Sequence, residues 1–230
     1  IIKNQFIMKQ FLFSCAVLLF VSAQAQFSVR VINLNLKFGA EEEMARLFEE
    51  YHKGPRNSGG AHFSSVNYLD NVTHRVIFAG DPANFGAKKI PTQAEQEAYM
   101  SKIYRLFDGK SSGSHVMTTL AWKGGDRDKN KFSKVWEFKA SDPAKYLQAH
   151  TTFVKAIEEI LGDRVVGLSS IDMGGSGGTH SVFMSGASLN DLVLTERALS
   201  NTKAFQTFIA NRGAVEMVSV YMTKNILRFN

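Results

Sequence analysis

Two histidines occupy matching positions in two similar stretches of this chain. Residues 73–84 read THRVIFAGDPAN and residues 179–190 read THSVFMSGASLN, so His74 and His180 each follow a threonine. An imidazole titrates near neutral pH and could act as a general base, a hydrogen-bond donor or a haem ligand. No second acid or ligand lies at a telling spacing. A structural role therefore competes, in which the pair fixes the start of a hairpin strand and a backbone carbonyl satisfies the ring.

A third histidine, His150, lies about one helical turn from Leu147 and Val154, so we expect it to face the sheet. It could line a pocket, or it could be a core histidine whose hydrogen bonds are satisfied. The sequence contains neither an HExxH nor a His-x-His spacing. We therefore predict no metal site, and we expect no cofactor.

Two tryptophans, Trp122 and Trp136, flank a hydrophilic segment at 123–132. They could stack on a ligand, or they could seal the interface between two halves of the molecule, where aromatic side chains are favoured. The GGSGG run at 174–178 lacks the Lys-Ser/Thr of a phosphate loop and lies between two expected strands. We predict that it is a hairpin loop.

The elements that must position these residues follow the same order in each half of the chain. Hydrophobic periodicity and turn residues predict strand, helix, two strands, helix and strand. In the first half these elements cover 29–38, 40–53, 62–69, 73–79, 92 to about 109, and 115–122. In the second half they cover 134–139, 142–162, 164–173, 179–186, 188–212 with a break at 200–202, and a strand within 214–227.

This order predicts an α+β fold of two tandem ferredoxin-like β-α-β-β-α-β units at 26–122 and 133–230, joined by a linker at 123–132. Each unit forms a four-stranded antiparallel sheet with both helices on one face. The two matching stretches lie 106 residues apart, which predicts duplication of a whole unit. Packing the two sheets face to face would cover their open faces as an intramolecular α+β barrel. Another arrangement of the two units is the alternative.

The arrangement resembles the dimeric α+β barrel superfamily, which includes antibiotic-biosynthesis monooxygenase-like, EthD-like and NIPSNAP-like proteins. The resemblance covers nearly all of residues 27–230 and rests on element order and duplication. It implies a pocket in each unit between helix and sheet, which keeps His150 among the candidate site residues.

The first 25 residues have the pattern of a secretory signal peptide. Translation is expected to start at Met8, which is followed by Lys9, an apolar run and an Ala23-Gln24-Ala25 cleavage site. A lipoprotein signal at Cys15 is an alternative, and the apolar run is too short for an uncleaved anchor. We expect a periplasmic or secreted protein that has no stable membrane insertion after cleavage.

The mature chain would begin at Gln26 and contain no cysteine, because Cys15 is the only one. It could then form no disulfide and offer no thiol nucleophile. Loss of Lys3 and Lys9 lowers the net charge from +6 to +4, spread along the chain, which argues against nucleic acid as a partner.

Two classes of function remain. One is an exported α+β barrel that binds a small apolar ligand or has a structural role, with Trp122 and Trp136 as candidate ligand contacts. The other is a cofactor-independent, monooxygenase-like enzyme that acts on an apolar or aromatic small molecule through His74, His180 or His150. The sequence predicts neither the ligand nor the oligomeric state.

Overall fold

The computed structural model describes residues 27–109 and 113–230, so the predicted signal peptide at 1–25 lies outside the described residues. The elements of the first half are β1 (Ser28–Leu34), α2 (Glu41–His52), β2 (Arg56–Ser58), β3 (Gly60–Asn67), β4 (His74–Gly80), η1 (Pro82–Asn84), β5 (Gly86–Ala87), α3 (Gln93–Tyr104) and β6 (His115–Lys123). Those of the second half are β7 (Phe132–Ala140), α4 (Pro143–Ala156), α5 (Glu158–Leu161), β8 (Val166–Gly174), β9 (His180–Gly186), α6 (Leu189–Ser200), α7 (Lys203–Asn211) and β10 (Val215–Phe229).

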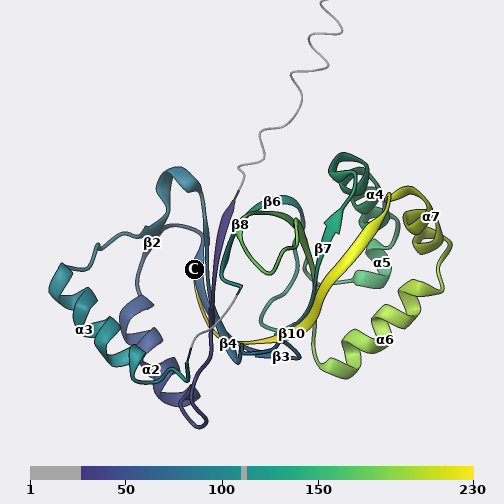
Figure 1. Cartoon of the computed structure of the whole chain (residues 1–230). Coiled ribbons are helices and arrows are strands. Elements are labelled where there is room, and N and C mark those ends of the chain that lie inside the picture. Colours follow the sequence, from purple (N-terminus) through teal and green to yellow (C-terminus); the bar gives the residue numbers. More distant parts are fainter. Residues whose placement is uncertain (1–26, 110–112) are drawn as a thin grey trace, which may run out of the picture.

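Eight strands close into one antiparallel barrel in the order β1-β4-β3-β10-β7-β9-β8-β6. Each half contributes four neighbouring strands, and the halves join where β3 pairs with β10 and where β6 pairs with β8. The helices of the two halves lie on opposite outer sides of the barrel (Figure 1). The predicted α+β barrel is therefore confirmed. Its two sheets also join edge to edge, because an unpaired edge would leave backbone hydrogen-bonding groups open.

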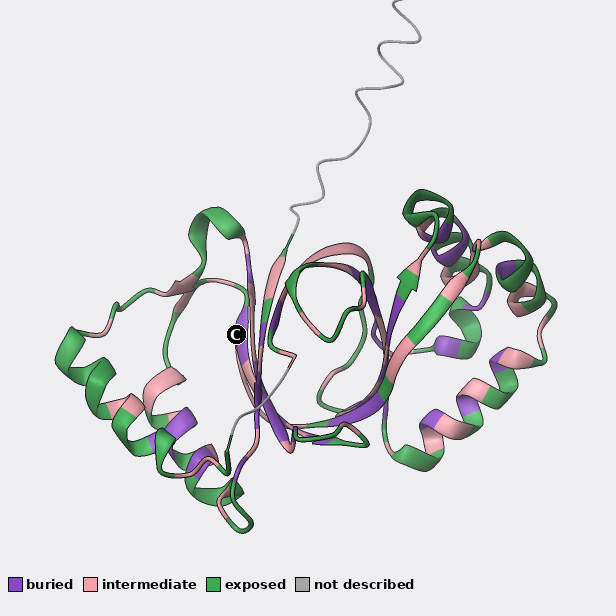
Figure 2. Cartoon of the chain, viewed as in Figure 1, coloured by how far each residue is buried: buried purple, intermediate pink, exposed green. Residues whose placement is uncertain are grey.

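Alternation along the strands gives the barrel two faces. On β3, Ala61 and Phe63 pack against the helices, so His62 between them faces the barrel interior. The same alternation on β9 directs Val182 and Met184 outward and Phe183 inward. Buried positions accordingly lie on the strands and on the helix faces that turn toward them (Figure 2).

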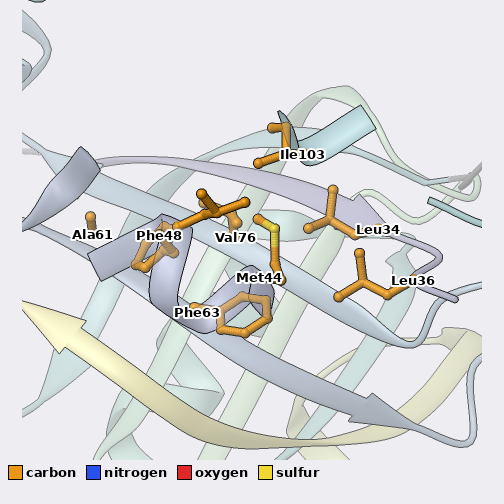
Figure 3. Close-up of a cluster of buried hydrophobic side chains, with 9 residues drawn as sticks. Leu34, Leu36, Met44, Phe48, Ala61, Phe63, Val76 and Ile103 are labelled. Carbon is orange, nitrogen blue, oxygen red and sulfur yellow. The ribbon is translucent and has the colours of Figure 1, made fainter. Parts of the chain in front are cut away.

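The outer core of the first half is formed by α2 against β1, β3 and β4. Met44, Leu47 and Phe48 of α2 are buried at helical spacing. They meet strand residues in one cluster, shown in Figure 3. Its buried members are Leu34, Leu36, Met44, Leu47, Phe48, Ala61, Phe63, Val76 and Ile103.

Local capping sets the helix boundaries of the second half. Asp142 accepts a hydrogen bond from the backbone N–H of Lys145, and Pro143 follows it at the start of α4. The expected break near 200–202 is present, since α6 ends at Ser200 and Thr202 caps α7.

Four features differ from the sequence-based expectation. The helix expected over 142–162 is divided at Ile157 into α4 and α5. The first strand ends at Leu34 rather than at Phe38, because only Leu36 beyond it forms a bridge, to Phe107. The helix expected to reach about residue 109 ends at Tyr104. Short strands β2 and β5 pair with each other in segments that we expected to be loops.

The turn before β3 requires glycine, because Gly59 has φ +64 and an added Cβ would lie 1.9 Å from the Ala79 carbonyl oxygen.

Candidate functional site

A pocket of about 320 Å³ lies between the helices and the outer sheet face of the second half. Its wall is mostly aromatic and aliphatic. Six aromatic side chains line it: Trp136, Phe138, Tyr146, Phe153, Phe205 and Phe208. Mostly apolar walls with a few polar groups are typical of small-molecule sites.

Helical and strand periodicity build this wall. Tyr146, His150 and Phe153 recur along one face of α4, while α7 supplies Phe205 and Phe208. The rings of Phe153 and Phe208 stack with centroids 4.9 Å apart, which joins the two helices. Strand alternation on β7 and β9 supplies the floor. The pocket is therefore framed by regular elements, which hold a site more rigidly than loops do.

His150 is the buried polar group of this pocket. Its Nδ1 is buried and has no hydrogen-bond partner in the part of the chain that the structure describes. Burial lowers the pKa of His150 to about 4, so the imidazole is neutral at pH 7. Burial raises the pKa of the neighbouring Tyr146 to about 12. The pocket thus offers a neutral imidazole that can accept a hydrogen bond or a proton.

Charged side chains also line the pocket, but the one acid among them is already paired. Glu196 bonds Lys134 at 2.6 Å, and the guanidinium of Arg212 lies 5.7 Å from the centroid of the Phe208 ring. Among residues 27–109 and 113–230, no group of three or more metal-ligating side chains could hold a metal ion. No helix in these same residues is long and apolar enough to cross a membrane.

His74 and His180 lie outside this pocket. The Nδ1 atoms are 3.0 Å and 2.8 Å from the hydroxyls of Thr73 and Thr179, respectively. The Nε2 of His74 also bonds Glu41 of α2 at 2.8 Å, so both of its nitrogens have partners. A threonine hydroxyl thus occupies the position where we expected a backbone carbonyl, and His74 has no nitrogen available for another ligand.

The two tryptophans have different surroundings. Trp136 lines the pocket, where Lys134 Nζ lies 5.2 Å from its ring centroid. Trp122 is 54% exposed and rests against Phe183, with centroids 5.5 Å apart. Sequence reasoning placed Phe153 on the apolar side of its helix but missed Phe205 and Phe208 as pocket residues. Their spacing of three residues was the available signal.

Acidification should destabilise the protein through His150. Its pKa is near 4 in the folded protein, whereas an exposed histidine titrates near 6.5. Between these values the unfolded chain binds more protons, so the free energy of unfolding falls as the pH drops, by up to about 1.4 kcal/mol per pH unit for this group. We expect His150→Leu to reduce the fall between pH 6.5 and pH 4.5 in urea unfolding. An unchanged fall would contradict the neutral, buried state.

Comparison with known proteins places the fold. No protein-family model and no curated protein matches the chain. A solved structure from Fusobacterium nucleatum subsp. nucleatum, provisionally named a monooxygenase, has 12% identity and a TM-score of 0.59 over 88% of this chain and 92% of that chain. An anthrone oxidase-like protein has 10% identity and a TM-score of 0.53 over 90% and 94%. A mutant chlorite dismutase from Candidatus Nitrospira defluvii has 12% identity and a TM-score of 0.51 over 87% and 92%. The chain therefore shares the α+β barrel fold of these proteins.

Proposed function

We propose that this protein is an exported binder of small aromatic molecules, which it holds between the α4–α7 helices and the sheet of the second half. The observation that carries the proposal is the aromatic pocket with one buried, unpartnered imidazole nitrogen, on His150. Such a nitrogen is costly to bury unless a ligand or water bonds it. A ligand with one polar group would satisfy it while its rings fill the apolar space.

The volume and the wall narrow the ligand class. A pocket of 320 Å³ is at the small end of the range of roughly 300–1,000 Å³ for ligand sites. Aromatic walls favour planar rings in offset-stacked or edge-on contact. We infer a ligand of one to three fused rings with a hydroxyl or carbonyl group that faces His150. The anthrone oxidase-like protein among the similar structures supports this class.

A monooxygenase-like enzyme is the second candidate, and the neutral imidazole of His150 favours it. A neutral histidine could accept a proton from a bound hydroxyl group and so prepare the ring for oxidation by O₂. His150→Ala would then abolish O₂ uptake but weaken ligand binding only modestly. For a binding protein, we expect no O₂ uptake with any ligand that the pocket holds.

Ligand binding can be measured with Trp136 alone, because the chain contains only two tryptophans. In Trp122→Phe protein, 1-naphthol or anthrone should quench Trp136 fluorescence in a saturable manner. Val182 lines the pocket, so Val182→Phe should fill it and weaken binding at least about tenfold through steric overlap. Val193 of α6 does not line the pocket, and Val193→Phe is the matched control. Equal affinity of the two variants would contradict the site.

Adding haem tests how large a ligand the same pocket can accept. We expect no Soret shift when haem is added to the purified mature protein, because the pocket is small. If a Soret shift appears and His150→Ala removes it, then haem is the ligand of this pocket and the proposed small aromatic ligand is wrong. Quenching by 1-naphthol without a Soret shift is the result that the proposal expects.

Export and duplication complete the proposal. Residues 8–25 support export, and the N-terminus of protein recovered from the periplasm or medium should be Gln26. An uncleaved chain retained in the cytoplasm would refute it. Duplication is supported by the matched Thr73–His74 and Thr179–His180 pairs, which start β4 and β9 and make the same side-chain contact. It is also supported by the equivalent strand order of the two halves.

A further inference from the structure

We propose that one end of the barrel binds a small oxyanion, a carboxylate or a phosphate, between the guanidinium groups of Arg127 and Arg228. This basic end consists of His62, Trp122, Arg127, Phe183 and Arg228. It belongs to the inner face of the barrel, whereas the aromatic pocket lies on the outer face of the sheet. The inference therefore stands independently of the proposed aromatic ligand.

Strand register places His62 and Arg228 together. Arg228 of β10 is paired with His62 of β3. Leu227 and Phe229, on either side of Arg228, both pack on the outer core, so Arg228 itself faces the barrel interior with His62. These positions are near the end of β10 and the start of β3, which define one end of the barrel.

Arg127 reaches the same end from the segment that joins the two halves. Its guanidinium lies 4.8 Å from the ring centroid of Phe183 and 5.6 Å from that of Trp122. This segment is held beside β10 by a backbone hydrogen bond of 2.8 Å from Asn225 to Lys131. Arg127 is thus packed over two aromatic rings, a setting that suits a planar guanidinium.

Positive charge at this end has no matching acid in the described chain. No ion pair or hydrogen bond within the described residues involves the guanidinium of Arg127 or that of Arg228. Burial and the charge of Arg228 lower the pKa of Arg127 to about 10. Burial, with the charges of Arg127, Arg228 and Arg56, lowers the pKa of His62 to about 3. Of the acids that flank Arg127, Asp126 accepts backbone hydrogen bonds from residues 128 and 129, and Asp128 is exposed.

The other arginine of the barrel interior shows the contrast. Arg75 is buried and is linked to Glu137 through the hydroxyl of Tyr221. Arg127 and Arg228, in contrast, are only half-buried. Trp122 beside Arg127 is 54% exposed. The guanidinium groups of the basic end are therefore within reach of a ligand from solution.

A bound oxyanion would reduce two unfavourable contributions to the free energy of the basic end. It would offset the repulsion between two partly desolvated cations, and it would accept their unused N–H donors. The planar guanidinium presents paired donors that match both carboxylate and phosphate. The neutral imidazole of His62 could donate a further hydrogen bond.

Trp122 provides the readout, because Trp136→Phe leaves it as the only tryptophan. In this background, inorganic phosphate, acetate and benzoate are titrated separately at constant ionic strength set with NaCl. At least one of them should change Trp122 emission in a saturable manner and raise the Tm. The anion with the lowest Kd in these titrations identifies phosphate or carboxylate as the ligand class.

Arg127→Gln and Arg228→Gln should each weaken this binding at least about tenfold, since each removes a charge-assisted contact. Among the described residues, Arg127 makes a cation–π contact with the Trp122 ring and Arg228 makes none with either tryptophan, so the Arg228 variant leaves the cation–π contact of the fluorophore in place. Arg105→Gln, at an exposed position of α3's C-terminal cap, is the matched control and should bind normally. Absence of saturation with all three anions, or equal affinity in Arg127→Gln, Arg228→Gln and the control, would overturn the proposal.

Discussion

Glu137→Ala should lower the free energy of unfolding by about 3–5 kcal/mol, because it leaves a buried cation without its countercharge. Glu137 is buried inside the barrel and accepts hydrogen bonds from Tyr221 at 2.6 Å and from Ser219 at 3.2 Å. Arg75 donates to the same tyrosine hydroxyl at 3.1 Å. The alanine variant would leave this network with an unbalanced guanidinium. Urea unfolding at pH 7 measures the loss.

Glu216→Ala is the matched control for this substitution. Glu216 pairs with Lys139 at 2.8 Å, but its side chain is 70% exposed. Solvent screening limits such a pair to about 0–1 kcal/mol. The double variant Arg75→Met/Glu137→Leu should recover much of the stability, since it removes both charges together. A loss below about 1 kcal/mol for Glu137→Ala would show that the buried network is not a stabilising unit.

Phe48→Ala should cost about 3–5 kcal/mol through loss of buried surface and formation of a cavity. Phe48 is fully buried at the centre of the first-half core (Figure 3). Its ring centroid lies 5.7 Å from that of Phe63 and 5.9 Å from that of Phe229. The substitution therefore removes contacts from α2 to both β3 and β10. The same urea experiment gives its value.

Phe38→Ala separates burial from residue type in that experiment. Phe38 has an exposure of 108%, so its removal should change the free energy of unfolding by no more than about 0.5 kcal/mol. Phe48→Ala should still bind the aromatic ligand, because Phe48 does not line the second-half pocket. If the two phenylalanine variants were equally stable, the described first-half core would be wrong.

Features set by neighbouring residues could be predicted from the sequence. The capping box of Thr92 and Glu95 is present, with both reciprocal hydrogen bonds. The turn at Asp70-Asn71 is also present, and Asn71 adopts the left-handed conformation that asparagine tolerates. The pairing of β2 with β5 could not be predicted. It joins residues about 30 positions apart in segments rich in glycine and proline, where no alternation marks a strand.

The same distinction holds for the candidate site: some of its features follow from local sequence pattern, and others depend on tertiary packing. Helical spacing predicted that His150 faces the sheet, and the structure places it in the pocket wall. That Glu41 would bond His74 depends on how α2 packs across β4, which local pattern does not encode. Arg127 lies in a hydrophilic run that reads as an exposed linker. Its contact with Phe183 arises only because barrel closure brings that segment over the inner face.

The pairing of β10 with β3 has a kinetic consequence. β10 is the last strand described, and it fills the gap between β3 and β7. Until it docks, both of these strands keep an open edge, and Phe48 lacks its contact with Phe229. β3 and β10 are far apart in the sequence, so the chain between them loses conformational entropy before these contacts form. This loss slows folding. We therefore expect the docking of β10 to be a late step that limits the rate of folding. A chain that stops before Val215 should expose the unpaired backbone edges of β3 and β7 and aggregate.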